Sequence, residues 1–476
     1  MIAASATFHN VTAVTFRYPH DCASPHFPFC LSPAAAEGLI IARHLADTIQ
    51  GDLPVGHHLM LEKQSAYGRM IDRLNRFPQG APESETLYSI LKMLFTEKEA
   101  DLVAQMPIRP FTAADAAKRW NMSETEAHKI LDNLAGRAML VDMDNHGEQM
   151  YCLPPPMAGF FEFSMMRVRK DVDQKTLAEL FNQYINVEED FMRELFVTGD
   201  TGLGRVFVQE PTVKEPYAME ILDWERATHV IETASQCGIS MCYCRHKKQH
   251  LGTACDAPMD ICMTFNTAAH SLIKHGHARE VSKSECLELL HQAWEHNLVQ
   301  FGENVREGVN FICNCCGCCC EALGAVKRFQ MTQTIHSNFI MQRNETACVN
   351  CGRCVQLCPV NALTMERDAE GNRRIEFNAE LCLGCGVCTR GCNHGAITLV
   401  PRPERTITPL NTTHRAVVMA TERGNLQDLI FDNRMLFSHR LLAGVLGAIL
   451  KMPAVKRSLA QKQLKSRFIE KICEKI

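Results

Sequence analysis

The sequence predicts a multidomain α+β protein that is mostly helical in its N-terminal and middle regions and carries a small α+β domain near its C-terminal end. Three observations support this fold class. The chain has 476 residues, 46% of them hydrophobic, so it can bury several cores. Apolar residues recur at helical spacing over much of the chain before residue 340. Between Cys348 and Cys392 one cysteine pattern occurs twice, and a strand-like stretch follows each copy.

Composition divides the chain into five predicted segments. They are a poorly defined extension, a helical domain, a cysteine-rich and mostly helical middle domain, a small cysteine-motif domain, and a linker with basic amphipathic helices. Their predicted bounds are 1–60, 61–165, 166–340, 341–400 and 401–476. In the extension, His20, Cys22, His26 and Cys30 lack the short fixed spacing of a zinc site, so we interpret this segment as loosely ordered.

The second segment has the element order of a winged helix. A helix is predicted from Thr112 to Trp120 and a longer one from Ser123 to about Arg137. Two strand-like stretches then flank the turn Asp144-Asn145-His146-Gly147, as in a β-hairpin. Thr96 and Ser123 are each followed three residues later by glutamate, which fits the capping box that begins a helix.

Winged helices are often DNA readers, but the residues here give little support for that role. The second helix carries Glu124, Glu126 and Asp132 against Lys129 and Arg137, which leaves little charge to neutralise phosphates. A fold alone does not fix a function. We therefore interpret the segment as an interaction module, with DNA binding as the disfavoured alternative.

The middle segment contains a second group of cysteines in two blocks. The first block opens with Cys242-Tyr243-Cys244-Arg245-His246-Lys247-Lys248 and continues through Cys255 and Cys262. The second is Cys313-Asn314-Cys315-Cys316-Gly317-Cys318-Cys319-Cys320. Six cysteines in eight residues cannot all fill a core, because neighbouring side chains point in different directions on a regular backbone. Some must be ligands.

We predict a further metal centre here, with thiolate ligands drawn from both blocks. The candidate ligands are Cys242, Cys244, Cys255, Cys262, Cys313, Cys315, Cys316 and Cys319. The first four and the last four could form two sets, or a mixture of the blocks could serve one cluster. Thiolate-rich sites select iron–sulfur clusters or zinc, and a reactive dithiol is a third alternative. The basic residues after Cys244, together with His250, would stabilise an anionic cluster.

The doubled pattern near the C-terminal end has the spacing of iron–sulfur ligands. The two copies are Cys348-x2-Cys351-x2-Cys354-x3-Cys358-Pro359 and Cys382-x2-Cys385-x2-Cys388-x3-Cys392. Three cysteines at this spacing converge on one cubane, while the fourth ligates the other cluster. The predicted ligands are therefore Cys348, Cys351, Cys354 and Cys392 for cluster I, and Cys382, Cys385, Cys388 and Cys358 for cluster II. Zinc would leave the Cys-Pro ending of the first copy unexplained.

An internal repeat extends past these ligands. An offset of 34 residues aligns Cys348 with Cys382 and also Ala362-Leu363-Thr364 with Ala396-Ile397-Thr398, and a turn cluster at 368–372 predicts a hairpin between the halves. Residues 345–400 resemble the bacterial-type two-cluster ferredoxins, which implies two [4Fe-4S] clusters and electron transfer. Asn393 stands where that family usually has proline, which puts the hydrogen bonding of one cluster in doubt but removes no ligand. The order of the segments also resembles an uncharacterised group of iron–sulfur proteins from anaerobes.

The C-terminal segment is basic. From Lys451 onward there are eight Lys or Arg residues against two Glu, on a stretch that places Leu459, Leu464, Phe468 and Ile472 at helical spacing. We predict a helix that packs on the domain, with contact to an anionic membrane surface or an acidic partner as the alternative.

Composition limits the classes of function. The net charge of −4 gives no electrostatic case for nucleic acid, and no apolar run reaches the ~18 residues of a membrane helix. The 24 cysteines cluster at metal spacing and no export signal is evident, which favours a reducing, anaerobic cytoplasm. We expect an electron-transfer protein that serves a partner oxidoreductase. A catalytic iron–sulfur subunit and a redox-sensing winged-helix regulator are the alternatives.

Overall fold

The computed structural model describes residues 63–330, 335–406 and 408–430, and it combines helices with several small sheets, as the α+β prediction requires. By its contacts this part of the chain belongs to one unit. The predicted N-terminal extension and the predicted basic helix after Lys451 lie outside the described residues. None of the helices in the described ranges combines the length and the apolar character needed to cross a bilayer.

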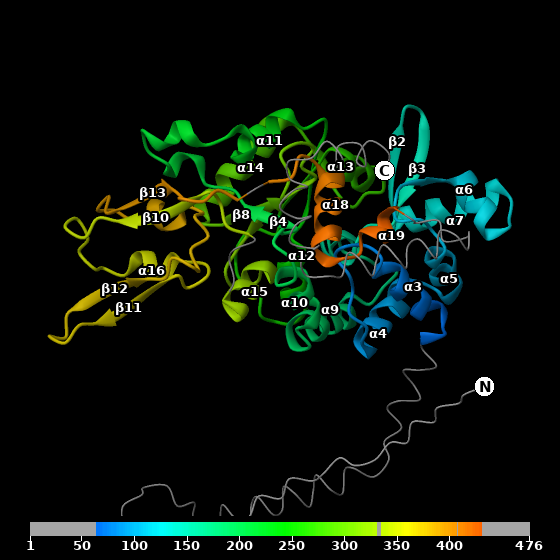
Figure 1. Cartoon of the computed structure of the whole chain (residues 1–476), viewed down its shortest axis with the longest axis horizontal. Coiled ribbons are helices and arrows are strands. Elements are labelled where there is room, and N and C mark those ends of the chain that lie inside the picture. Colours follow the sequence, from blue (N-terminus) through cyan, green and yellow to red (C-terminus); the bar gives the residue numbers. More distant parts are fainter. Residues whose placement is uncertain (1–62, 331–334, 407, 431–476) are drawn as a thin grey trace, which may run out of the picture. The chain divides into compact units, whose positions relative to one another are not determined.

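The first elements follow the order predicted for residues 61–165. The helices are α3 (Ala66–Leu74), α4 (Glu85–Leu94), α5 (Glu97–Ala104), α6 (Ala113–Trp120) and α7 (Glu124–Gly136). The strands β1 (Phe111–Thr112), β2 (Val141–Asn145) and β3 (Glu148–Cys152) form a sheet in the order β1-β3-β2. The β2–β3 hairpin projects near α6 and α7 (Figure 1).

Two of these helices begin at the predicted caps. At α5 the Thr96 hydroxyl accepts from the Glu99 backbone N–H and the Glu99 carboxylate accepts from the Thr96 N–H, which completes a capping box. At α7 only one half of the pattern forms, because the Ser123 hydroxyl accepts from the Glu126 N–H. The helix–helix–hairpin order is therefore present, and a winged-helix function stays a prediction.

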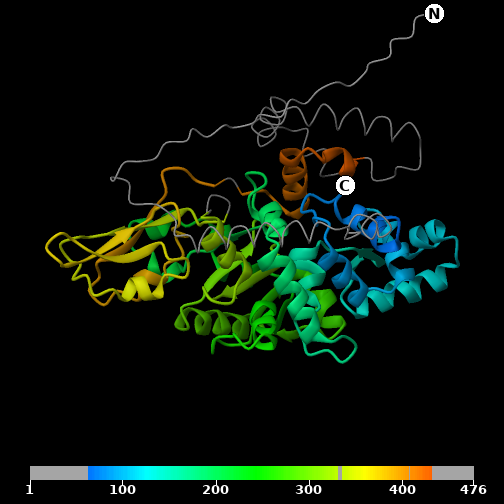
Figure 2. The same cartoon turned by 90° about the horizontal axis from the view of Figure 1, so that it is seen from below.

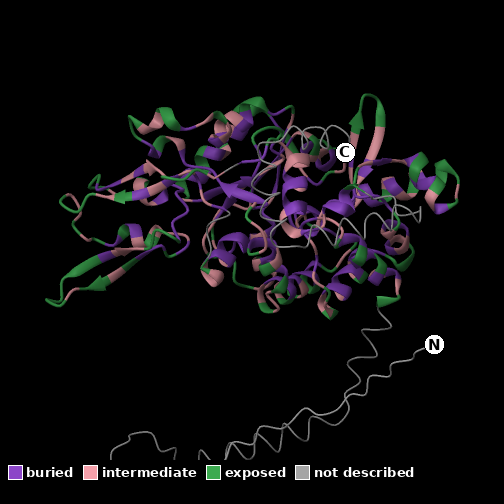
Figure 3. Cartoon of the chain, in the orientation of Figure 1, coloured by how far each residue is buried: buried purple, intermediate pink, exposed green. Residues whose placement is uncertain are grey.

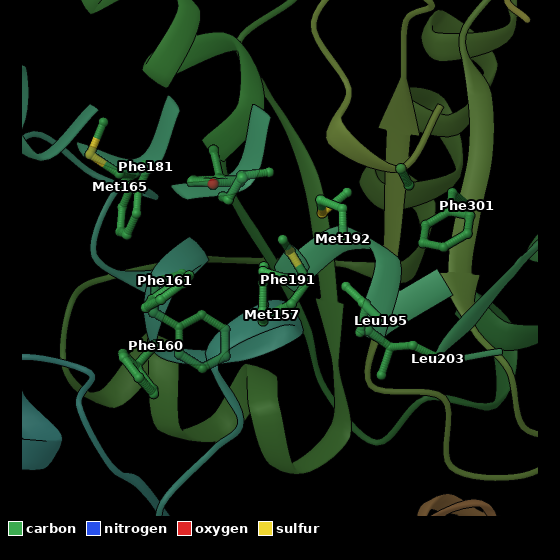
Figure 4. Packing of buried hydrophobic residues seen from close by; sticks show 14 of the residues in the cluster. Met157, Phe160, Phe161, Met165, Phe181, Phe191, Met192, Leu195, Leu203 and Phe301 are labelled. Carbon is green, nitrogen blue, oxygen red and sulfur yellow. The ribbon is translucent and has the colours of Figure 1, made fainter. Parts of the chain in front are cut away.

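A phenylalanine-rich core follows the hairpin. It is built on the π-turn η1 (Pro156–Phe160) and helices α8 (Phe161–Phe163), α9 (Gln174–Asn182) and α10 (Asp190–Phe196), with a second π-turn, η2 (Gln183–Val187), before α10. The ring centroids of Phe161 and Phe181 lie 4.8 Å apart. The rings of Tyr184 and Phe191 are stacked, with 5.1 Å between their centroids. Figure 4 shows this packing and its continuation toward Met192, Leu203 and Phe301.

The middle of the chain contains a six-stranded antiparallel sheet that the sequence did not predict. Its strands are β4 (Gly204–Val206), β5 (Cys237–Met241), β6 (Asp260–Phe265), β7 (Arg279–Val281), β8 (Val299–Glu303) and β9 (Phe311–Cys315), in the order β4-β8-β9-β6-β5-β7. Each pair of neighbouring strands is antiparallel. Most residues of β4, β5, β6 and β8 are buried (Figure 3). The prediction of a mostly helical region missed this sheet, although helices also lie in the region.

Five helices and three short 3-10 turns surround this sheet. The helices are α11 (Ala227–Thr233), α12 (Tyr243–His250), α13 (Asn266–Lys274), α14 (Lys283–Glu295) and α15 (Glu321–Phe329), and the turns are η3 (Glu210–Thr212), η4 (Tyr217–Glu220) and η5 (Asp223–Glu225). Side chains from α11, α14 and one face of the sheet share a core that includes Ile231, Leu290, Met263 and Ile312.

The opposite face of the sheet carries cysteines. Side chains alternate along a strand, so Cys313 and Cys315 of β9 share a face, while Ile312 and Asn314 share the other. The register that pairs Met263 with Ile312 places Cys262 of β6 beside Cys313, with 3.8 Å between the two Sγ atoms. The sheet thus holds three cysteines on one surface.

The region of the repeated cysteine motif contains two small two-stranded antiparallel sheets. Strand β10 (Phe339–Arg343) pairs with β13 (Ile397–Pro401), and β11 (Leu363–Arg367) pairs with β12 (Arg373–Phe377), which is the predicted hairpin. The short helices α16 (Arg353–Leu357) and α17 (Val387–Arg390) lie one in each half. This region is yellow in Figure 2.

The described part of the chain ends with two helices. They are α18 (Thr412–Arg423) and α19 (Leu426–Ile430), which share a small core with Ile108. Near the end of α18, the Glu422 carboxylate accepts hydrogen bonds from Asp200 and Thr201 of the glycine-containing loop at 199–204.

Candidate metal centres

In both halves of the motif, a glycine with positive φ sets the path of the cysteine loop. Gly352 (φ 80°) and Gly386 (φ 92°) directly precede α16 and α17, so a helix begins two residues after Cys351 and two residues after Cys385. A Cβ on Gly386 would lie 2.2 Å from Oγ1 of Thr212, so a larger residue is also excluded by space. The sequence repeat therefore corresponds to a repeat of backbone conformation.

The cysteines predicted for cluster II lie around one small cavity. The cavity has a volume of about 20 Å³, and its walls include Cys358, Cys382, Cys385 and Cys388. Burial raises the pKa of Cys388, and the neighbouring Cys385, Cys382 and Cys358 charges raise it further. The Sγ of Cys358 accepts a hydrogen bond from the Ala362 N–H at 3.2 Å. The chain thus carries the fourth cysteine of the first copy to the three cysteines of the second.

The cysteines predicted for cluster I are nearer the surface. Cys354 is buried and Cys351 is exposed. Burial raises the pKa of Cys354, and the charges on Cys348 and Cys351 add to the shift. Gly391, directly before Cys392, would place a Cβ 2.0 Å from Cδ1 of Leu357. The ends of the two copies therefore pack against each other. Asn393, where proline was expected, is exposed.

In the middle segment, four cysteines meet in one place, which we call the four-cysteine site. It consists of Cys255, Cys316, Cys318 and Cys319, whose sulfur atoms all lie within 4.8 Å of one another. The Cys255 Sγ lies 3.6 Å from that of Cys316 and 3.7 Å from that of Cys319. A hydrogen bond from Cys319 lowers the pKa of Cys316 to about 4, and the Arg245 charge contributes to the shift. Four converging thiols suit zinc or an iron–sulfur cluster.

The grouping differs from the two sets of four suggested by the sequence blocks, and follows the mixed alternative. Cys255 joins residues of the second block, and Cys318 completes the site although sequence reasoning did not select it. The other predicted ligands meet elsewhere, together with Cys320, which sequence reasoning also missed. We call this second group the six-cysteine cavity: Cys242, Cys244, Cys262, Cys313, Cys315 and Cys320.

Alternation along the strand and loop explains how adjacent cysteines separate. Cys315 ends β9 and belongs to the six-cysteine cavity, whereas Cys316 follows in the loop and belongs to the four-cysteine site. Likewise Cys319 belongs to the four-cysteine site, and Cys320, the N-cap of α15, to the cavity. The strand-like pattern Phe311-Ile312-Cys313-Asn314-Cys315 was the signal in the sequence that could have revealed this division.

Of the basic residues predicted to stabilise a cluster, Arg245 lies among the cysteines. It is fully buried, and its guanidinium donates to the Pro258 carbonyl at 2.6 Å and to the Asn314 carbonyl at 2.7 Å. Burial opposes its charge, but the Cys242, Cys316 and Cys315 thiolates together raise its pKa. The other members serve the fold.

Lys247 forms a buried ion pair with Glu321, and the Nδ1 of His246 lies 2.7 Å from the Met165 carbonyl. His250 contacts His246, with 3.2 Å between their Nε2 atoms. Of the predicted basic cluster, Arg245 thus lies beside the cysteines, whereas Lys247, His246 and His250 make contacts that stabilise the fold.

The four-cysteine site lies against the motif region. A Cβ on Gly317 would lie 2.4 Å from the carbonyl oxygen of Pro359, the residue after Cys358. A cleft of about 590 Å³ is lined by Cys255, Cys316 and Cys318 on one side and by Cys358 and Pro359 on the other. Cysteines from two segments of the chain therefore face the same cleft.

Comparison with known proteins identifies one segment. Residues 347–396 match the family model of the 4Fe-4S dicluster domain, which covers about a tenth of the chain. No curated protein and no solved structure matches the chain. The matched segment contains all eight cysteines of the doubled motif, so residues 347–396 are similar to a ferredoxin-like iron–sulfur domain and the chain is an iron–sulfur protein.

Proposed function

We propose that this chain is an electron-transfer protein that holds two [4Fe-4S] clusters in residues 347–396 and a further metal centre at the four-cysteine site. The observation that carries the proposal is the family match, together with the position of Cys358 at a cavity with Cys382, Cys385 and Cys388. That position supports the crossed ligand sets, because a cysteine of one copy meets three of the other. When bound, such clusters accept and release single electrons.

The residues of the chain supply what such clusters need. Eight cysteines offer the thiolates, and Leu363, Ile375, Leu399 and other buried side chains of the four short strands exclude water. Cys351 is exposed on the cluster I side. A redox partner would therefore approach the cluster I side, where one of the proposed ligands is exposed.

Contact between the motif region and the four-cysteine site supports a connected path. Gly317 packs on Pro359, and both sites face one cleft. Thiolate ligands select iron–sulfur clusters, zinc or copper(I), and the neighbouring dicluster segment favours iron here. We propose that electrons exchanged with a partner oxidoreductase reach the middle of the chain by this route.

Metal analysis tests the proposal. Anaerobically purified protein should contain at least about twelve irons per chain, with about eight in the motif region and about four at the four-cysteine site. A Cys255→Ser, Cys318→Ser double variant should lose about four of them and retain the EPR signals of the two reduced dicluster centres. About four irons in the wild-type protein, or zinc in place of iron in the motif region, would contradict the two-cluster assignment.

A further inference from the structure

The six-cysteine cavity is not used by the proposed function. Its thiols form a continuous series of contacts across two strands and two helix ends. Cys242 contacts both Cys244 and Cys262, and Cys262 lies 3.8 Å from Cys313 between Sγ atoms. Cys320 contacts Cys244 and closes the series at Cys315. Cys316 and Cys319 of the four-cysteine site also reach the wall, so the two sites are neighbours.

The cavity is larger than normal packing leaves. Its volume is about 130 Å³, whereas protein interiors contain few voids larger than a water molecule. Apart from the cysteines its wall is largely apolar, with Met157, Met192, Leu203 and Phe301 among its side chains (Figure 4). Six thiols that served only as core fillers would close such a space, because unfilled volume costs stability.

Two buried polar side chains at this cavity keep a hydrogen-bonding atom without a partner among the described residues. Tyr243 lines the cavity and is 3% exposed, and its buried hydroxyl has no hydrogen-bond partner among the described residues. Arg245 also lines it, and no carboxylate of the described ranges pairs with its guanidinium, whose Nε is unsatisfied. A buried donor and a buried cation together require an acceptor that carries negative charge.

We propose that Cys242, Cys244, Cys262, Cys313, Cys315 and Cys320 bind a second middle-region iron–sulfur centre that has more metal than one four-iron cubane. One cubane takes four thiolates, whereas six cysteines in a series of contacts line this cavity. Zinc would bind thiolates directly at about 2.3 Å and needs no cavity, whereas the inorganic sulfides of an iron–sulfur core occupy volume. An anionic core also supplies the acceptor for Tyr243 and the counter-charge for Arg245.

Iron, zinc and acid-labile sulfide analysis of the anaerobically purified full-length chain tests this inference. We expect more than about sixteen irons per chain, since the dicluster segment and the four-cysteine site account for about twelve and one cubane would add only about four. A Cys262→Ser, Cys313→Ser double variant should fall to about twelve irons. The Cys255→Ser, Cys318→Ser variant should lose the about four irons of the four-cysteine site and keep the irons of the six-cysteine cavity. Cys152→Ser, outside both sites, is the control and should change nothing.

Several results would overturn the inference. A wild-type total of about sixteen irons or fewer, stoichiometric zinc, or unchanged iron in Cys262→Ser, Cys313→Ser would each contradict it. Because the dicluster signals are recorded on the same samples, failure of this inference is distinguishable from failure of the proposed function.

A milder variant covers the case in which the double cysteine variant does not fold. Tyr243→Phe removes only the unpartnered hydroxyl, so iron content should stay at the wild-type value. Loss of a hydrogen bond to the centre should shift the reduction potential of one EPR signal and leave the dicluster signals in place. If the reduction potentials of all EPR signals were unchanged in Tyr243→Phe, the hydroxyl would have no partner in a metal centre, and the proposed site would be overturned.

Discussion

Lys247 with Glu321 is the most deeply buried ion pair of the described residues. Their side chains are 0% and 5% exposed. Lys247 lies in α12 and Glu321 begins α15, so the pair joins the two helices that begin at Cys242 and Cys320. The two helices that follow Cys242 and Cys320 are thus held together by a buried ion pair.

Removal of one partner should therefore destabilise the fold strongly. Lys247→Met leaves the Glu321 carboxylate buried without its cation, at a cost of about 3–5 kcal/mol. The double variant Lys247→Met, Glu321→Leu removes both charges and should recover most of the loss. Urea unfolding followed by circular dichroism gives the free energies of unfolding, and equal stability of the wild type and Lys247→Met would refute the prediction.

A buried histidine gives the stability a pH dependence. His277 is 2% exposed, and its Nε2 lies 3.1 Å from the Gly136 carbonyl at the end of α7. Burial lowers its pKa to about 4, despite the Gly136 contact, and the charges on Arg167, Arg169 and His275 lower it further. The unfolded chain binds the proton more readily, so stability should be full above pH ~6.5 and fall as the pH drops toward ~4.

Below pH ~4, the titration of His277 should lower the free energy of unfolding by roughly 3 kcal/mol. Unfolding midpoints measured between pH 8 and pH 4 should fall less steeply in His277→Gln, which carries no titrating group at this position. Other groups also titrate in this range, so the slope difference between the variants is the quantity compared. Parallel curves would show that His277 titrates normally in the folded protein.

At the scale of elements, loops at the ends of strands place the ligands. The hairpin β11–β12 and the two short helices of the motif region were predictable because each depends on a few neighbouring residues and on glycine turns such as Gly386. The six-stranded sheet was not, because its strands have three to six residues and pair across long stretches of chain, as β4 does with β8. The recruitment of Cys255 to Cys316 depends on the same long-range pairing.

The contact between the loop after β9 and the motif region can be tested at Gly317. A Cβ there would lie 2.4 Å from the Pro359 carbonyl oxygen and 2.8 Å from its Cα, and backbone atoms cannot give way as a flexible side chain can. Gly317→Ala should cost about 1–3 kcal/mol. Gly324→Ala in α15 is the matched control, because no atom lies within 4 Å of its Cβ position, and it should be neutral or stabilising. Thermal unfolding of the two variants should differ; similar midpoints would mean that the loop does not pack on Pro359.

At the scale of the whole molecule, the motif region and the six-stranded sheet differ in how much buried apolar side chains can stabilise them. The motif region has two separate two-stranded sheets and few large buried side chains. The core shared by α11, α14 and the six-stranded sheet contains Ile231, Leu290, Trp294 and Ile312, and none of the predicted ligands. A small domain with little core usually needs a metal or disulfide to fold.

Removal of the metal should therefore unfold the two regions to different extents. After treatment with a chelator and an oxidant, residues 339–401 should become sensitive to protease, while residues 227–312 stay protected. Mass spectrometry of the fragments locates the cuts, and untreated protein is the control. Cleavage first within residues 227–312 would show that the sheet core, too, depends on the metal.

The alternation of adjacent cysteines between two sites has a consequence for assembly. Residues 315–320 supply cysteines to both the four-cysteine site and the six-cysteine cavity, so a metal bound at one would fix the backbone of the other. Loading one site lowers the conformational entropy that the second must lose, which makes their maturation cooperative. Chains with metal at only one of the two sites should then be scarce. Insertion or deletion of one residue within 315–320 would move cysteines from each site toward the other.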